Sequence, residues 1–261
     1  MIGAAAGDII GSIYEHNPIK TEDFPLFSSD ARFTDDTVMS LAVAQAILQD
    51  KNYGREMKSL GQLFPSAGYG GNFQRWIFEP DISPYNSWGN GSAMRVSPVG
   101  FAFDTAEEVL REARASAEVS HDHPEGVKGA QAVAMAIMLA RQGASKEEIR
   151  TNVAGTFFYD LDRTVEEIRP DYRFDVSCMG SVPEAIIAFL DSTDYESAVR
   201  KAVSLGGDSD TQACIAGAIA EAHYQFIPFS IISEVKRILP GILWKIVERF
   251  EQAYPWCDLG V

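Results

Sequence analysis

Glycine recurs at every fourth position near the start of the chain, at Gly3, Gly7 and Gly11, with alanines between. Residues four apart lie on the same face of an α-helix, so this spacing predicts a helix with one face of small residues. Another helix can approach such a face closely, which places the element in the core. Asp8 lies inside this predicted helix, and Glu15 lies just beyond its expected end.

The rest of the chain continues in helical patterns. We find no sustained alternation typical of strands and no unit that repeats at a fixed spacing. No break in composition divides the 261 residues, which fit one large domain. The sequence therefore predicts an all-α fold, a single compact multi-helix domain over residues 1–261.

Individual helices are expected where caps and apolar periodicity agree. Prolines and capping boxes set several of the expected starts, including Pro124 and Pro183. The segments 66–100 and 159–176 lack regular periodicity and are expected to be irregular. The expected helices cover 35–49, 55–64, 104–119, 124–141, 145–157, 183–190 and 194–204, with two more in 230–254 separated at Pro240-Gly241.

Two distant segments each place carboxylates and a hydroxyl at the start of an expected helix. Thr34-Asp35-Asp36 precedes one, and Asp208-Ser209-Asp210-Thr211 follows a tight turn at Gly206-Gly207. Helix capping explains either segment alone, but a cap needs one oxygen and each segment supplies more. Carboxylate and hydroxyl oxygens suit hard cations. We therefore expect one shared site for Mg²⁺ or Mn²⁺, bound by Thr34, Asp35, Asp36, Asp208, Asp210 and Thr211.

A glycine-rich stretch, Gly89-Asn90-Gly91-Ser92, offers backbone N–H groups without bulky side chains. Successive N–H groups of this kind can hold phosphate oxygens, and Arg95 lies near enough to add charge. An ordinary tight turn explains the same residues equally well.

His121 and His123 stand two residues apart, before Pro124. Zinc would require further Cys or His residues nearby, and the sequence offers none. A structural hinge is one interpretation of this turn, and contact with a ligand is the other.

Overall charge limits the classes of partner. The chain has 22 Lys and Arg against 37 Asp and Glu, a net charge of −15, which disfavours a nucleic-acid surface. Three widely spaced cysteines give neither a disulfide framework nor a zinc pattern, and the apolar start is too short to span a bilayer. We expect a cytoplasmic monomer with no membrane anchor.

These motifs together resemble the ADP-ribosylglycohydrolase family, of the dinitrogenase reductase-activating glycohydrolase type. The resemblance rests on Gly7-Asp8, Glu15, the two acidic segments and Gly89 to Arg95, in one order from residue 3 to about 222. It implies an all-α hydrolase with two Mg²⁺ or Mn²⁺ ions, acting on an ADP-ribosylated protein or a small ADP-ribosyl conjugate. It also implies that the acid after the Gly-Asp helix, Glu15, belongs to the catalytic site.

The resemblance assigns the remaining roles. Glu15, Asp35 and Asp36 are the expected catalytic carboxylates. ADP-ribosyl-arginine is the expected substrate, with ADP-ribosyl-serine as an alternative. A two-metal phosphoesterase and a catalytically weak ADP-ribose-binding module are the competing functions. The expected substrate-binding residues are Gly89, Asn90, Gly91, Ser92, Met94, Arg95, His121 and His123.

Overall fold

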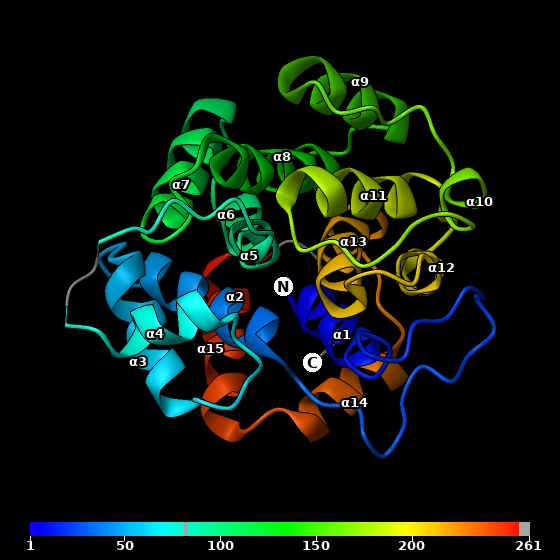
Figure 1. The fold of residues 1–261 in the computed structure, drawn as a ribbon. Helices are drawn as coiled ribbons and strands as arrows, with labels where there is room; N and C mark the ends of the chain where they lie inside the picture. The colour runs from blue at the N-terminus through cyan, green and yellow to red at the C-terminus, as the bar shows by residue number, and fades with distance from the viewer. Residues whose placement is uncertain (81–82, 256–261) are drawn as a thin grey trace.

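The computed structural model describes residues 1–80 and 83–255, and within these ranges the chain forms helices and no β-strand (Figure 1). The predicted all-α fold, a single compact domain, is confirmed. The helices are α1 (Ile2–Gly11), α2 (Asp35–Ile47), α3 (Tyr53–Leu63), α4 (Gly71–Phe78), α5 (Gly91–Met94), α6 (Ser97–Ala102), α7 (Ala106–Glu118), α8 (Pro124–Arg141), α9 (Lys146–Phe157), α10 (Val165–Ile168), α11 (Cys178–Leu190), α12 (Tyr195–Ser204), α13 (Ser209–Tyr224), α14 (Phe229–Ile238) and α15 (Gly241–Ala253).

The helices α1 and α13 form the central pair, and their backbones touch along the glycine stripe. A methyl group added to Gly7 would lie 2.0 Å from the carbonyl oxygen of Ala213, and one added to Gly11 would lie 2.4 Å from that of Ser209. Glycine is required at these positions because any side chain would overlap the neighbouring backbone. The predicted close helix contact is therefore confirmed.

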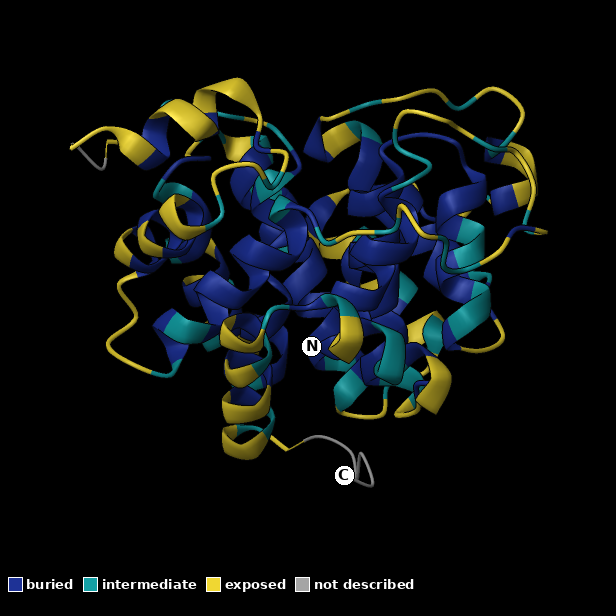
Figure 2. Cartoon of the chain, turned by 90° about the horizontal axis from the view of Figure 1, so that it is seen from below, coloured by how far each residue is buried: buried dark blue, intermediate teal, exposed yellow. Residues whose placement is uncertain are grey.

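The other helices surround this pair. The helices α8, α11 and α12 pack against α13, while α7 and α9 cover α8. On the other side α2 packs against α3, α6 and α15, and α14 packs against α1 (Figure 1). Every residue of α1 and residues 209–222 of α13 are buried, whereas exposed residues lie on the outer helices and loops (Figure 2). Polar side chains on the central pair are consequently shielded from water.

Most helix starts agree with the sequence because local hydrogen bonds determine them. Ser145 and Glu148 form the reciprocal capping box expected for α9. Thr105 accepts a hydrogen bond from the backbone N–H of Glu108 at the start of α7. The helices α12, α14 and α15 also begin and end close to their expected limits.

The expected start at Pro183 is wrong. The helix α11 begins at Cys178, where the Ser177 hydroxyl accepts a hydrogen bond from the N–H of Gly180 at 3.0 Å. Pro183 lies inside the helix and cannot donate to the carbonyl group of Met179, a residue of the first turn whose side chain is exposed. The cap at Ser177 thus outweighs the missing hydrogen bond.

The segments expected to be irregular contain short helices. In 66–100 the helix α4 buries Phe73, Trp76 and Ile77, whose spacing of three and four residues is helical. In 159–176 the helix α10 has a capping box of Thr164 and Glu167. Each helix is too short to stand out against the glycine, proline and charge around it.

None of the helices in the described part of the chain is both long and apolar enough to cross a membrane.

Replacing Gly7 with alanine tests the central contact. Gly7→Ala should lower the free energy of unfolding by about 2 kcal/mol or more, because overpacking against a buried backbone cannot be relieved by rotating a side chain. Gly155→Ala is the matched control, since Gly155 lies in α9 with nothing within 4 Å of the added methyl. That control should be neutral or stabilising by about 0.5 kcal/mol, because alanine is the better helix former. Urea denaturation followed by circular dichroism measures both, and equal stabilities would contradict the close contact.

Candidate active site

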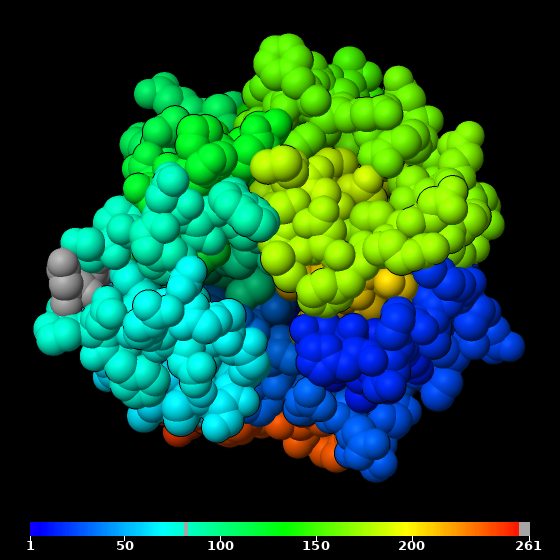
Figure 3. All heavy atoms as spheres, viewed as in Figure 1, coloured from blue at the N-terminus to red at the C-terminus, as the bar shows by residue number. Residues whose placement is uncertain are grey.

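A cavity of about 730 Å³ opens beside the central helix pair. This volume is in the range of small-molecule sites. Figure 3 shows its mouth as a hollow between the cyan residues of the α4 region, the dark blue N-terminal residues and the yellow-green segment before α11. The lining residues come from the segments 15–16, 32–36, 66–73, 85–95, 174–176 and 208–211, and from His121.

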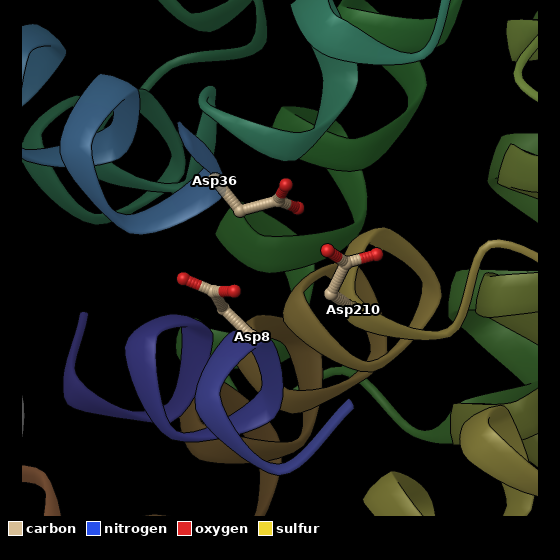
Figure 4. Close-up of side chains that lie close together, drawn as sticks. All are labelled: Asp8, Asp36 and Asp210. Carbon is tan, nitrogen blue, oxygen red and sulfur yellow. The ribbon is translucent and has the colours of Figure 1, made fainter. Parts of the chain in front are cut away.

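Three carboxylates from three helices meet at the base of this cavity: Asp8 of α1, Asp36 of α2 and Asp210 of α13 (Figure 4). One oxygen from each lies within 4.8 Å of the others, and all three residues are buried. Asp36 and Asp210 line the cavity, while Asp8 lies behind them. We call Asp8, Asp36 and Asp210 the inner triad.

A second group shares Asp210. Glu15, Asp208 and Asp210 also bring one oxygen each within 4.8 Å of one another. We call them the outer triad, because the Glu15 side chain is 24% exposed. The structure therefore brings Asp36, from the first acidic segment, next to Asp210, from the second, although 174 positions separate them in the sequence.

Asp8 holds the start of α2 in place. Its Oδ2 accepts hydrogen bonds from the backbone N–H groups of Thr34 at 2.9 Å and Thr37 at 3.1 Å, and from the Thr37 hydroxyl. Its Oδ1 accepts from the Thr34 hydroxyl at 2.7 Å. A carboxylate at a helix N-terminus is favourable because it satisfies free N–H groups and faces the positive end of the helix dipole. Asp8 thereby fixes the position of Asp36.

Asp36 has spare bonding capacity. Its Oδ2 lies 3.4 Å from the hydroxyls of both Thr34 and Thr211, whereas its Oδ1 is buried without a hydrogen-bond partner. A buried carboxylate oxygen without a donor is costly, and a hard cation satisfies such an oxygen well. The acidic clusters could therefore hold a metal ion.

Burial and mutual repulsion raise the pKa values of these acids. Burial raises the pKa of Asp8 to about 7, with Asp210 adding to the effect and hydrogen bonds from Thr34 and Thr37 opposing it. Burial and then Asp210 also hold the pKa values of Asp36 and Asp208 well above the usual range. A bound cation would offset the repulsion that keeps these groups from ionising together.

Glu15 differs from the buried acids because it lies nearer the cavity mouth. Its pKa is raised by burial and by Asp210, and lowered in part by His16 and Arg32. His16 Nε2 lies 3.7 Å from Glu15 Oε2. A half-buried carboxyl with a raised pKa is suited to donating and accepting a proton.

Asp35 lines the cavity but belongs to neither triad. A methyl group on Gly68 would lie 3.3 Å from Asp35 Oδ1, so this carboxylate faces the loop before α4. Burial, then Asp210 and Asp8, hold its pKa well above the usual range.

The second acidic segment is held by a turn and by Asn90. Gly206 has a φ of +65°, and a methyl on Gly207 would lie 2.3 Å from the Tyr172 ring, so both glycines are required. Asp208 stands at the N-cap of α13 but makes no side-chain cap hydrogen bond. Instead its Oδ2 accepts from Asn90 Nδ2 at 2.7 Å.

The glycine-rich loop is partly committed to its own structure. The N–H of Gly89 donates to Ser87 Oγ at 3.2 Å, and the N–H of Asn90 donates to the carbonyl oxygen of Val176 at 2.8 Å. Contrary to the expectation from the sequence, these two N–H groups are therefore not free to bind phosphate. Gly91 lines the cavity, whereas Ser92 is buried and donates to the carbonyl oxygen of Gly126 at 2.6 Å.

The structure places Arg95 beneath this loop. It has no exposed surface, its Nη2 donates to the carbonyl oxygen of Ser116 at 2.9 Å, and its guanidinium lies 5.5 Å from the Phe73 ring centre. Burial lowers the pKa of Arg95 to about 10. Its hydrogen bonds are thus directed to the end of α7, which local sequence did not indicate.

The remaining expected residues divide into two groups. Thr34, Thr211, Met94 and His121 line the cavity. His123 lies outside the lining and caps α8, where its Nδ1 accepts from the N–H of Glu125 at 3.1 Å. The structural role therefore applies to His123 and the cavity position to His121.

Sequence reasoning missed Asp8 as a site residue and missed Phe174 and Val176 in the cavity wall. Asp8 could have been recognised as a site residue because it is a carboxylate inside a helix that otherwise carries no charge. Phe174 and Val176 lie at the end of the segment 159–176, which was expected only to be irregular, and they are 51% and 44% exposed.

Comparisons with known proteins identify the family and similar chains. A model of the ADP-ribosylglycohydrolase family matches residues 1–258. ADP-ribosylhydrolase ARH3 of Homo sapiens is 28% identical over 308 aligned positions, covering 86% of this chain and 84% of that protein. ADP-ribosylarginine hydrolase Tri1 of Pseudomonas putida is 24% identical, covering 86% of this chain and 69% of that protein. A solved structure described as an ADP-ribosylglycohydrolase-related protein complex is 25% identical, with a TM-score of 0.73 over 97% of this chain and 95% of that chain.

The triads predict that divalent cations stabilise the protein. Excess Mn²⁺ or Mg²⁺ added after chelation should raise the free energy of unfolding, by about 2.7 kcal/mol at a hundredfold excess over Kd. Asp36→Asn should reduce this increment, because it removes the charge of the carboxylate whose Oδ1 has no partner. Asp23→Asn, at an exposed acid away from the cavity, should leave the increment unchanged. Denaturant titrations with and without metal measure it, and equal increments in both variants would contradict the site.

Proposed function

The chain belongs to the ADP-ribosylglycohydrolase family, and we propose that it hydrolyses the glycosidic bond between ADP-ribose and an acceptor group, with ADP-ribosyl-arginine as the preferred substrate. The single observation that carries this proposal is the pair of triads sharing Asp210 at the base of a cavity of about 730 Å³. Such a cavity can enclose a ligand of nucleotide size. In this proposal, the carboxylates at the base of the cavity act on the bond that is cleaved.

Two divalent cations, Mg²⁺ or Mn²⁺, fit the oxygen groups of this site. Asp36, Asp208 and Asp210, with the hydroxyls of Thr34 and Thr211, would hold them. When bound, such ions supply charge that orients hydroxyl groups and a water molecule. The partnerless Oδ1 of Asp36 and the raised pKa values of the buried acids support this assignment.

Glu15 is the proposed proton-transfer group. It is the triad member nearest the cavity mouth, and its raised pKa favours holding a proton that the leaving group requires. Glycosidic cleavage develops positive charge on the sugar ring, which nearby carboxylates stabilise. Asp35 and Asp36 are the other candidates, of which Asp35 faces the cavity from outside both triads.

The glycine-rich loop and its neighbours would bind the rest of the nucleotide. Gly91 and Met94, at the two ends of α5, line the same cavity as the acids. Tyr85 and Trp88 lie on the same wall, and Trp88 is 48% exposed, so a ring is available for stacking on adenine.

The preference for arginine follows from charge. Glu15, Asp35 and Asp208 all line the cavity, and the chain carries a net charge of −15. A guanidinium acceptor gains from such surroundings, whereas the neutral oxygen of a serine linkage gains nothing. One relative is named an ADP-ribosylarginine hydrolase, which points in the same direction.

Replacing Glu15 tests the proton-transfer role. Glu15→Gln should reduce turnover on the order of a hundredfold and leave ADP-ribose affinity nearly unchanged, because the amide keeps the shape and loses the proton. Glu107→Gln, at an exposed glutamate of α7, is the matched control and should retain full turnover. Steady-state kinetics with ADP-ribosyl-arginine measure both variants. Unchanged turnover in Glu15→Gln would move the role to Asp35 or Asp36.

A substrate panel tests the bond that is cleaved. Mass spectrometry should detect free ADP-ribose from ADP-ribosyl-arginine, and both excess chelator and Asp208→Asn should abolish its release. Cleavage of ADP-ribosyl-serine with none at arginine would overturn the substrate preference. Release of inorganic phosphate or AMP would identify a phosphoesterase, and tight ADP-ribose binding without turnover would identify a binding module.

A further inference from the structure

Three polar side chains form a hydrogen-bonded chain beneath the glycine-rich loop. Arg95 Nη2 donates to Ser120 Oγ at 3.0 Å, and Ser120 Oγ lies 2.8 Å from His121 Nδ1. Arg95 and Ser120 have no exposed surface, and His121 is 5% exposed. Ser120 does not line the cavity and is shielded from water, so its hydroxyl hydrogen needs an acceptor from the protein.

The direction of these hydrogen bonds follows from what each group can do. A guanidinium only donates, so Ser120 Oγ is the acceptor in its contact with Arg95. If His121 Nδ1 also donated to this oxygen, the hydroxyl hydrogen of Ser120 would have no acceptor among the described residues. A buried donor without an acceptor is costly. Ser120 therefore donates to Nδ1, which leaves the proton of the neutral ring on Nε2.

The imidazole ring of His121 directs its Nε2 toward the glycine-rich loop. A methyl group on Gly91 would lie 3.0 Å from Nε2, and one on Gly89 would lie 3.6 Å from it. Burial and the Arg95 guanidinium hold the pKa of His121 well below its usual range, so the ring stays neutral. The cavity wall thus presents an N–H group rather than a lone pair at this point.

We infer that Arg95 and Ser120 are positioning residues: they hold His121, already an expected substrate-binding residue, in the tautomer protonated on Nε2, so that it meets the ligand as a hydrogen-bond donor. The ligand half of this inference rests on the proposed function. The loop needs such a donor because the N–H groups of Gly89 and Asn90 are already used within the protein.

Nitrogen-15 NMR of the histidine side chains tests the tautomer without any ligand. The chain has four histidines, so His121→Gln assigns the signal by its loss. The wild type should show one neutral form, protonated on Nε2, and Ser120→Ala should show a mixture of both tautomers. Ser116→Ala is the matched control. It removes another fully buried hydroxyl from the same region but leaves the hydrogen bonds between Arg95, Ser120 and His121 in place. Protonation on Nδ1 in the wild type, or an unchanged spectrum in Ser120→Ala, would overturn the inference.

Calorimetric titration with ADP-ribose tests the donor role. The glutamine amide can place an N–H where Nε2 lies, whereas the shorter asparagine amide reaches only the position of Nδ1. His121→Asn should therefore weaken binding about tenfold or more, as expected for loss of a hydrogen bond to a charged group, and His121→Gln should recover most of it. Equal losses in the two variants would overturn the donor role. If the wild type fails to bind ADP-ribose, the proposed function fails, and the NMR result alone decides the tautomer.

Discussion

The contact between α1 and α13 is the constraint on which the rest of the structure depends. The glycine stripe that lets the two backbones touch lies beside Asp8, and the residues it meets on α13, Ser209 and Ala213, flank Asp210. Helix packing and the acidic centre are thus one interface. Close packing holds together carboxylates that would otherwise separate, so the energy of burying apolar surface offsets their repulsion.

The acidic centre is built in layers around this contact. Asp8 is fully committed to the start of α2, which frees Asp36 to face the cavity. Asn90 holds Asp208 in a similar way from the glycine-rich loop. Asp8 and Asn90 therefore orient Asp36 and Asp208. The carboxylates that face the cavity depend on supporting side chains behind or beside them.

The sequence predicted features that arise from local chemistry. Capping at Ser145, the helical glycine stripe and the two oxygen-rich helix starts all depend on residues within a few positions of one another. Asp8 and Arg95 were different, since their roles depend on which distant helix lies opposite. Arg95 is next to a glycine-rich loop in sequence, but the carbonyl groups that attract it end α7, more than twenty positions away. Only tertiary packing determines that choice.

The central contact also determines when the site can form. The backbone N–H of Gly3 donates to Glu221 Oε2 across 218 positions, so joining α1 to α13 closes nearly the whole chain into a loop. Bringing such distant segments together costs entropy that nearby contacts do not recover. During synthesis α1 cannot pack against α13 until α13 has left the ribosome. The acidic centre therefore cannot form before α13 is available, and no N-terminal fragment that stops short of α13 contains it.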